Sequence, residues 1–298
     1  MSAPSTTEAD PHREGFALVA VMGFLLVAAA FITPFAITAR TQHLITLNLD
    51  QQLRLDGWAE AIGQIVAQSI ARSPDDLRIP SDSTPVLCEI GEYKVQVRRQ
   101  DQKGLIDLNA AGSDLISLGF QSLGFEKQLS LLLAQAVILH RSYEIPSAEA
   151  AAKLPVSAGM KHASLESVAE LYDLDALNET EIADLHLVFT VHSKRGEVSG
   201  PDAPKRLASF LDNMDAHRPS VTTAVETFSL EVSVSSNKTS ISGYSGFIFQ
   251  PSSLPNQVPT RLEPLLAPIV KGANLAIPET CSPGLHAAVS DLLREIAL

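Results

Sequence analysis

Histidines, serines and paired carboxylates are the side chains most often used in catalysis, and their spacing in this sequence forms no catalytic set. His186 and His192 lie six positions apart, and no H-E-x-x-H zinc motif occurs among the eight histidines. The segment Gly243–Phe247 (GYSGF) starts like the nucleophile elbow of hydrolases but lacks the final glycine. The glycine-rich patterns that bind nucleotides are also absent from the sequence. The sequence therefore predicts a protein that is not an enzyme.

The charge balance argues against nucleic acid as a partner. The 298 residues include 22 Lys and Arg against 34 Asp and Glu, which gives a net charge of −12. Nucleic-acid binding needs clustered cations, because affinity comes from releasing the counterions of the phosphates. Hydrophobic residues make up 45% of the chain, enough for a sizeable core. Two cysteines are too few for a disulfide framework, a four-cysteine zinc site or an iron–sulfur cluster.

Residues 16–39, near the amino end, carry no charge, and Arg40 ends this apolar segment. About 20 apolar residues in a helix cross the hydrocarbon core of a membrane. A removed secretory signal would be shorter, and Ala36–Thr38 is a mediocre cleavage site. A plain signal anchor fits the length, and a third interpretation rests on the residues where the apolar segment begins. Pro34 lies inside the segment, where we expect it to kink the helix.

The residues at that junction, Gly15–Met22 (GFALVAVM), resemble the cleavage signal of type IV pilins and pseudopilins. The resemblance implies that a prepilin peptidase cuts after Gly15 and that the new terminal residue, Phe16, is methylated. Family members usually carry Glu at the fifth mature position, where its carboxylate pairs with the terminal amine of a neighbouring subunit. An unpaired carboxylate is costly in hydrocarbon, so the Glu is kept only where a partner amine arrives. In this sequence Ala20 occupies that position.

The family member without this Glu is the minor pseudopilin K of type II secretion, which sits at the fibre tip with no subunit above it. Three later segments resemble the same family in the same order, namely Gly104–Ala111 (GLIDLNAA), Phe189–Ser193 (FTVHS) and Val198–Pro204 (VSGPDAP). In those proteins the first segment opens a large α-helical domain inserted between strands of the pilin sheet. The sequence thus resembles the general secretion pathway protein K family, which implies a non-enzymatic subunit that initiates or caps the fibre for export across the outer membrane.

The residue pattern predicts an α+β fold, in which a long N-terminal helix packs on an antiparallel sheet and a large helical insertion separates the strands. The helix is expected to continue over 41–73, where apolar residues recur at helical intervals: Leu47, Leu53, Leu55, Trp58, Ile62, Ile65, Val66 and Ile70. Strands are predicted at 86–90, 93–99, 187–192, 227–235 and 240–250, with turns at 91–92 and 236–238. Short helices are predicted at 114–119, 126–140, 148–154, 167–171, 178–185 and 203–213.

The predicted organisation has six regions. They are a leader at 1–15, the transmembrane half of the helix at 16–39, an amphipathic helix with the first strands at 40–103, the insertion at 104–215, the closing strands at 216–250 and a proline-rich tail at 251–298. Seven prolines in the tail predict an extended, irregular chain. A short amphipathic helix is predicted at 286–298, with Ala287, Leu292, Leu293 and Ile296 on one side.

Several short polar residues are predicted to hold turns and helix ends. Ser167-x-x-Glu170 and Asn178-x-x-Glu181 match the capping box at the start of a helix. Asp107 and Asn109 flank a leucine at a chain reversal, where short polar side chains bond to nearby backbone N–H groups. We interpret these residues as structural rather than chemical.

The resemblance also implies a location, partners and an ion. The location is the bacterial inner membrane, with a single span and the C-terminal domain in the periplasm. The implied partners are the minor pseudopilins of the I and J type, the pseudopilus, the prepilin peptidase and the inner membrane, with no nucleic acid. Calcium is the one cofactor that the resemblance suggests, because family members bind it in the helical domain. The weak ligand candidates, none with EF-hand spacing, are Asp173, Asp175, Asp212 and Asp215.

Cys88 lies in the first predicted strand and Cys281 in the tail. In an oxidising periplasm the two could pair and join the tail to the sheet. Sequence cannot fix the geometry that a disulfide needs, so a bond and two free thiols both stay open.

An alternative hypothesis is a membrane-anchored helix-hairpin-helix protein that binds DNA in the periplasm. The segment Ile106–Ala111 and the short helices after it suggest such a protein. DNA binding would need clustered cations, and the insertion offers, among more numerous acids, Lys161, Lys194, Arg195, Lys205 and Arg206.

Overall fold

The computed structural model describes residues 11–72, 77–143, 161–211, 227–239, 241–252, 257–266 and 279–296. By its internal contacts the chain divides into two compact units, Met1–Gln52 and Leu53–Leu298. The predicted helix at 148–154, the ends of the leader and of the tail, and Asp212 and Asp215 lie outside the described residues.

Helix α1 (Pro11–Arg72) is the first element and contains Pro34. The proline does not end the helix, which continues on both sides of it. Among the described residues one helix is long and apolar enough to cross a membrane, and it is this one, from Leu18 onward. The predicted continuation of the membrane segment into a second helical half is therefore confirmed.

The second half of α1 buries a stripe of apolar side chains. The buried residues of the stripe are 3% exposed or less and recur at helical intervals: Leu55, Ala59, Ile62, Val66, Ala67 and Ile70. Trp58 packs edge-on against Tyr93, with ring centroids 4.8 Å apart. Two residues of the predicted stripe, Leu47 and Leu53, are instead 51% and 69% exposed, and the buried part of the stripe begins at Leu55.

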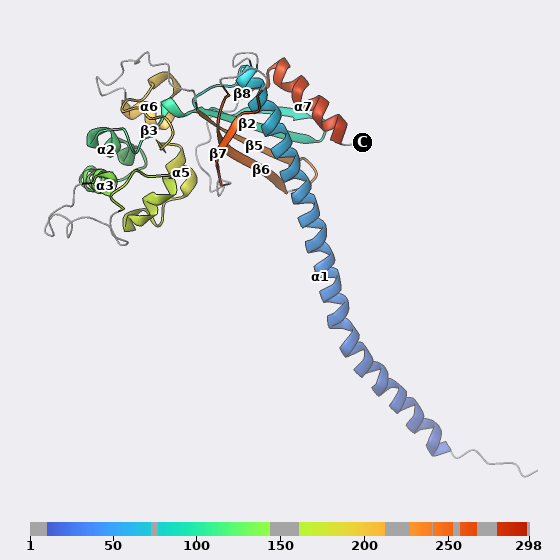
Figure 1. Ribbon diagram of the computed structural model, residues 1–298. Coiled ribbons are helices and arrows are strands. Elements are labelled where there is room, and N and C mark those ends of the chain that lie inside the picture. The colour runs from blue at the N-terminus through green and yellow to red at the C-terminus, as the bar shows by residue number, and fades with distance from the viewer. Residues whose placement is uncertain are drawn as a thin grey trace, which may run out of the picture. The chain divides into compact units, whose positions relative to one another are not determined.

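The stripe packs on a six-stranded sheet with the order β7-β6-β5-β2-β1-β8 (Figure 1). The strands are β1 (Val86–Ile90), β2 (Tyr93–Asp101), β5 (Phe228–Ser236), β6 (Ser242–Gln250), β7 (Thr260–Pro264) and β8 (Glu279–Thr280). All neighbours pair antiparallel except β1 and β8. Side chains alternate along the strands, so that Val95, Val97 and Val232 face the core and are fully buried. The predicted α+β fold and the two predicted hairpins are confirmed.

The described part of the tail is more regular than its prolines suggested. The predicted irregular chain is wrong at Thr260–Pro264 and Glu279–Thr280, which form strands, and the predicted terminal helix is present but begins earlier, at Pro283. Strands β7 and β8 form the two edges of the sheet, and helix α7 (Pro283–Ile296) packs on its core. The buried face of α7 consists of Leu285, Val289 and Leu293, one every four residues. Ala287, predicted on the same side as Leu293, is exposed. It lies on a different face of the helix from Leu285, Val289 and Leu293.

Between β2 and β5 the chain forms the insertion, a set of short elements around a second apolar core. These elements are η1 (Gln102–Gly104), β3 (Ile106–Asp107), α2 (Ser113–Ser122), α3 (Lys127–Arg141), η2 (Val168–Asp173), η3 (Asp175–Leu177), α5 (Ile182–His186), β4 (Phe189–Thr190), η4 (Gly200–Asp202) and α6 (Lys205–Leu211). The strand predicted at 187–192 is reduced to β4, which pairs parallel with β3. The helical insertion between strands is therefore confirmed.

Of the two predicted capping boxes, one is present and one is not. At Ser167 both reciprocal bonds form, and the box starts the 3-10 helix η2. Asn178 instead ends η3, where its N–H donates to the carbonyl of Asp175, and α5 begins only at Ile182. The Asn178 box is wrong because the chain turns at 178–181, where Thr180 N–H donates to the carbonyl of Leu177.

Candidate functional site

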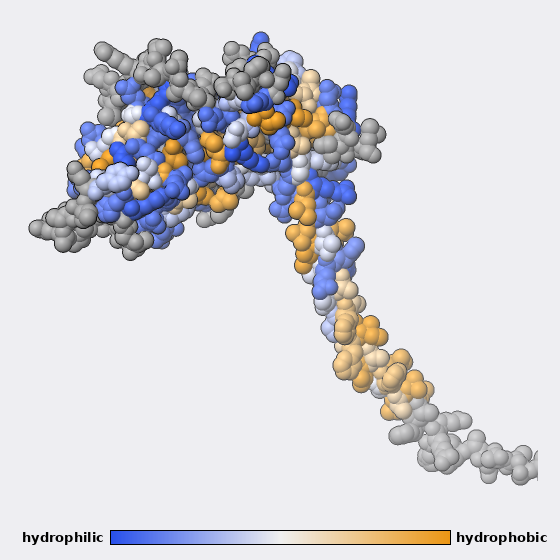
Figure 2. All heavy atoms as spheres, in the orientation of Figure 1, coloured by the Kyte–Doolittle hydropathy of each residue, from blue (hydrophilic) through white to orange (hydrophobic). Residues whose placement is uncertain are grey.

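The apolar part of α1 in the first unit is uncovered within the chain. Leu18, Phe24 and Phe35 are 65%, 72% and 77% exposed. Figure 2 shows the hydrophobic colouring gathered along this part of the helix. Gly15 and Phe16 belong to the same helix, and Ala20 is exposed on it. Such a continuous apolar surface needs hydrocarbon or other apolar helices around it.

The side chain of Asp107 accepts four hydrogen bonds in the insertion. Its side chain is buried, with the residue 1% exposed. Its Oδ1 accepts hydrogen bonds from the backbone N–H groups of Asn109 (2.8 Å) and Ala110 (3.0 Å). Its Oδ2 accepts from Lys194 N–H (2.7 Å) and Ser193 Oγ (3.2 Å), more than eighty residues further along the chain. The carboxylate thus closes its own turn, as predicted, and also holds the loop after β4.

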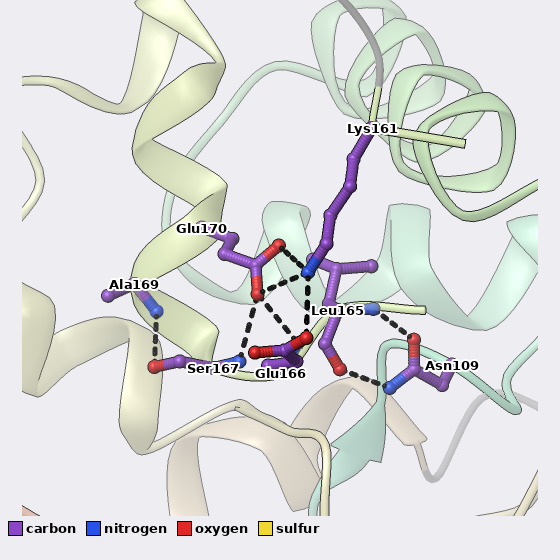
Figure 3. A network of polar contacts seen from close by, with 7 residues as sticks. All are labelled: Asn109, Lys161, Leu165, Glu166, Ser167, Ala169 and Glu170. Carbon is purple, nitrogen blue, oxygen red and sulfur yellow. Dashed lines mark hydrogen bonds and ion pairs between the residues drawn. The ribbon is translucent and has the colours of Figure 1, made fainter. Parts of the chain in front are cut away.

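Asn109 extends this site to the loop before η2. Its side-chain amide donates to the carbonyl of Leu165 and its Oδ1 accepts from Leu165 N–H, both at 2.8 Å (Figure 3). Ser167, two residues further, caps η2 and accepts from Ala169 N–H (Figure 3). The guanidinium of Arg141 donates to the carbonyls of Leu108 and Ala111. These polar residues fix the loops of the insertion to one another.

A second polar cluster, around Asp202, joins the insertion to the end of β2. Asp202 accepts from Ser81 Oγ (2.6 Å) and contacts Lys103 Nζ (3.4 Å), and its carbonyl accepts from Gln100 Nε2 (2.8 Å). The Asp202 carbonyl also lies against Gly104, where any side chain would collide with it. The glycine that opens the resembling segment Gly104–Ala111 is therefore required for this close approach.

The two cysteines form a disulfide bond. The structure joins Cys88 in β1 to Cys281, just before α7, and their Cα atoms are 4.8 Å apart. Cys88 is fully buried in the core between the sheet and α1. The bond fixes the start of α7 to the first strand. It also answers the question, left open by the sequence, of whether the two cysteines pair.

Of the four calcium candidates, the structure describes Asp173 and Asp175. Asp173 ends η2 and Asp175 opens η3. The described residues contain no group of three or more His, Cys, Asp or Glu side chains that could hold a metal ion. Calcium binding therefore stays a prediction from the resemblance.

The insertion's cations are partly engaged by its own acids and carbonyls. Lys161 lies 2.9 Å from Glu170 and 3.6 Å from Glu166 (Figure 3). Arg206 donates to the carbonyl of Ser122. Such pairing reduces the positive potential that a DNA-binding surface requires.

His140, which sequence reasoning did not single out, is a buried histidine in α3. It is 4% exposed, and neither ring nitrogen has a hydrogen-bond partner among the described residues. Burial lowers the pKa of His140, and the carboxylates of Asp173 and Glu170 offset this only in part. The folded insertion therefore favours the neutral ring, and its stability is complete above the unfolded pKa near 6.5 and falls as the pH drops below it.

The lowered pKa of His140 predicts a pH dependence of stability that can be measured. Between pH 7.5 and pH 5.5 we expect the hydrogen-exchange protection of α3 to fall in the wild type, after correction for the intrinsic exchange rate. His140→Leu keeps an apolar side chain of similar size and removes the titrating ring, so its protection should depend less on pH. Equal pH dependence in both proteins would contradict a lowered pKa for His140 in the folded insertion.

The chain has a structural likeness to a known secretion component. The chain is similar to a chain in the crystal structure of the GspK-GspI-GspJ complex from the type 2 secretion system of enterotoxigenic Escherichia coli. The alignment covers 77% of this chain and 99% of that chain, with a TM-score of 0.45 and 12% sequence identity. No known family and no curated protein matches the sequence. A likeness of this size assigns no role to any residue.

Proposed function

We propose that this protein is a minor pseudopilin at the tip of a type II secretion pseudopilus. It is a non-enzymatic subunit that helps to initiate or cap the fibre that drives protein export across the outer membrane. Its partners are other minor pseudopilins of the I and J type, and the periplasm holds its C-terminal domain. We also propose the regions predicted from the sequence, which include a leader at 1–15 and an insertion at 104–215.

The observation that carries the proposal is the junction at Gly15–Met22 together with the helix that follows it. The junction has the glycine and the phenylalanine of a prepilin cleavage signal, and Ala20 takes the place of the usual Glu. The same helix is uncovered through its apolar part and packs on an antiparallel sheet from Leu55 onward. Without a carboxylate at residue 20, the subunit has no group to pair with the terminal amine of a subunit above it.

The parts of the molecule serve this role by contact. The apolar half of α1 lies in the membrane or among the apolar helices of neighbouring subunits. Beyond the membrane segment, Leu44, Ile45 and Leu49 remain more than half exposed, which extends the surface available to other helices. The insertion adds a second folded core beyond the sheet, and its bulk prevents further subunits from stacking on this one.

Leader removal tests the proposal through a single residue. Gly15→Ala is expected to block cleavage almost completely, because a prepilin peptidase requires the glycine that precedes the cut. The tagged protein, produced in bacteria with a type II system, should stay at its full precursor mass on an immunoblot. Gly23→Ala is the matched control, since the structure leaves open space around Gly23, and this variant should be processed normally.

The same strains test the role in export. Deleting the gene should strongly reduce type II substrates in the medium, and the Gly15→Ala variant should fail to restore them. Normal processing of Gly15→Ala would contradict the assignment to this family. Undiminished export in the deletion strain would contradict the role in secretion.

A further inference from the structure

The insertion is attached to the sheet at one covalent position. The chain leaves the sheet after Asp101 in β2 and returns at Phe228 in β5, and these two residues pair with each other. Next to them, Gln102 N–H donates to the carbonyl of Thr227 (2.9 Å). We call this connection, together with the Asp202 contacts beside it, the neck. Because the chain crosses between the sheet and the insertion at this one place, the neck alone would let the insertion rotate relative to the sheet.

Strand β7, from the tail, gives the sheet a second contact with the insertion. It is an edge strand, separated from β5 by β6. Leu265 N–H donates to the carbonyl of Gly246 (2.8 Å). The guanidinium of Arg261 forms two bonds with Glu60 of α1, of 2.8 Å and 3.0 Å, and lies 4.2 Å from the ring centroid of Phe247. The strand is therefore fixed to both α1 and the sheet.

Glu263 is the residue of β7 that reaches the insertion. Its Oε1 accepts a hydrogen bond from Ser167 Oγ (2.5 Å), and its Oε2 lies 3.1 Å from His192 Nε2. Ser167 caps η2 and His192 follows β4, so both partners belong to the insertion. The Glu263 side chain is 19% exposed, and its partners shield it from bulk water. One carboxylate thus bridges two elements of the insertion.

The charge state of Glu263 suits this bridge. Burial raises the pKa of its carboxyl, but the bonds from His192 and Ser167 and the nearby His186 outweigh burial, so the pKa is lowered overall. The side chain is therefore ionised at neutral pH. Hydrogen bonds to a charged acceptor are about twice as strong as neutral ones.

We infer that β7 is a strap that fixes the orientation of the insertion relative to the sheet, and that Glu263 is the positioning residue through which it acts. The neck lies at β2 and β5, and β7 is two strand spacings from β5, which is about 10 Å. Two attachments separated by that distance prevent rotation about the neck. This strap is a property of the fold and does not depend on the proposed place in a fibre, so a failure of secretion would leave it untouched.

Spin-label distance measurement tests the strap on the full chain in detergent. Both native cysteines are in the disulfide, so labels can be attached to introduced cysteines at Ser242 in β6 and Gln128 in α3, which are both exposed. We expect one narrow distance distribution in the otherwise wild-type protein. Glu263→Ala should broaden it severalfold or split it, because the bonds from β7 to Ser167 and His192 are lost. Trp58 fluorescence should stay unchanged and show that the core of the sheet is intact.

Two further variants complete the test. Glu279→Gln changes a carboxylate on β8, the opposite edge strand, and should leave the distribution narrow. His192→Ala removes one partner of Glu263 without altering β7, and should broaden the distribution less than Glu263→Ala does. If the Glu263→Ala protein fails to fold, His192→Ala replaces it in the test. A distribution as narrow as in the wild type, in a folded Glu263→Ala protein or in its substitute, would overturn the inference.

Discussion

Replacing Asp107 by alanine should destabilise the insertion by about 4 kcal/mol, close to the upper end of single substitutions. The change removes a buried acceptor of four hydrogen bonds and leaves the N–H groups of Asn109 and Lys194 without this partner in a partly buried turn. Buried donors without a partner cost more than the bond itself contributes. The carboxylate also faces the Arg141 guanidinium, so its loss removes a favourable charge interaction.

Hydrogen exchange measured by mass spectrometry separates the insertion from the sheet. In Asp107→Ala the protection of peptides from β3, α2 and α3 should fall about a thousandfold, the factor that corresponds to 4 kcal/mol. Peptides from β2 and β5 should change much less. Asp114→Ala is the matched control, because Asp114 is exposed in the first turn of α2 and contributes at most about 1 kcal/mol there. A loss of protection in Asp107→Ala no larger than in this control would contradict the account of the site.

Removing the disulfide should destabilise the core between the sheet and α1 by about 3 to 5 kcal/mol. The bond joins residues 193 positions apart, and the entropy lost by the unfolded chain grows with the length of the closed loop. Cys88→Ala with Cys281→Ala should also free the start of α7, whose Leu285, Val289 and Leu293 cover the same core.

Trp58 reports this effect, because the single tryptophan packs on Tyr93 in that core. Its fluorescence in urea should show a lower midpoint for the double alanine variant than for the oxidised wild type. A reducing agent should bring the wild type to nearly the same midpoint and leave the variant unchanged. Equal midpoints for oxidised wild type and variant would show that the bond adds no stability.

Local pattern predicted much of this fold where it matched the final packing. The strands at 86–90 and 93–101 and the hairpin between Phe228 and Gln250 follow from alternation and turn residues, because each is completed by its neighbour in sequence. The buried stripe on α1 follows from helical spacing, but its start at Leu55 depends on where the sheet lies.

The strands of the tail and the start of its helix were missed because prolines interrupt helices and strands in most positions but not in all. Pro264 closes an edge strand, where an absent N–H is tolerated, and Pro283 is the first residue of α7, a favourable place for proline. The contacts of the polar residues were likewise predicted only where both partners are close in sequence. Sequence indicated that Asp107 holds its own turn, but its bonds to Ser193 and Lys194 come from a loop that only the folded chain brings near.

The amino terminus of the mature protein is the most direct test of the central claim. The protein should be extracted from the membrane of a bacterium that has a prepilin peptidase, and its first peptide identified by mass spectrometry. We predict a peptide that begins at Phe16 and carries one methyl group on its terminal amine. A peptide that begins at Met1 or Ser2 would leave an ordinary membrane anchor and contradict the assignment as a pseudopilin.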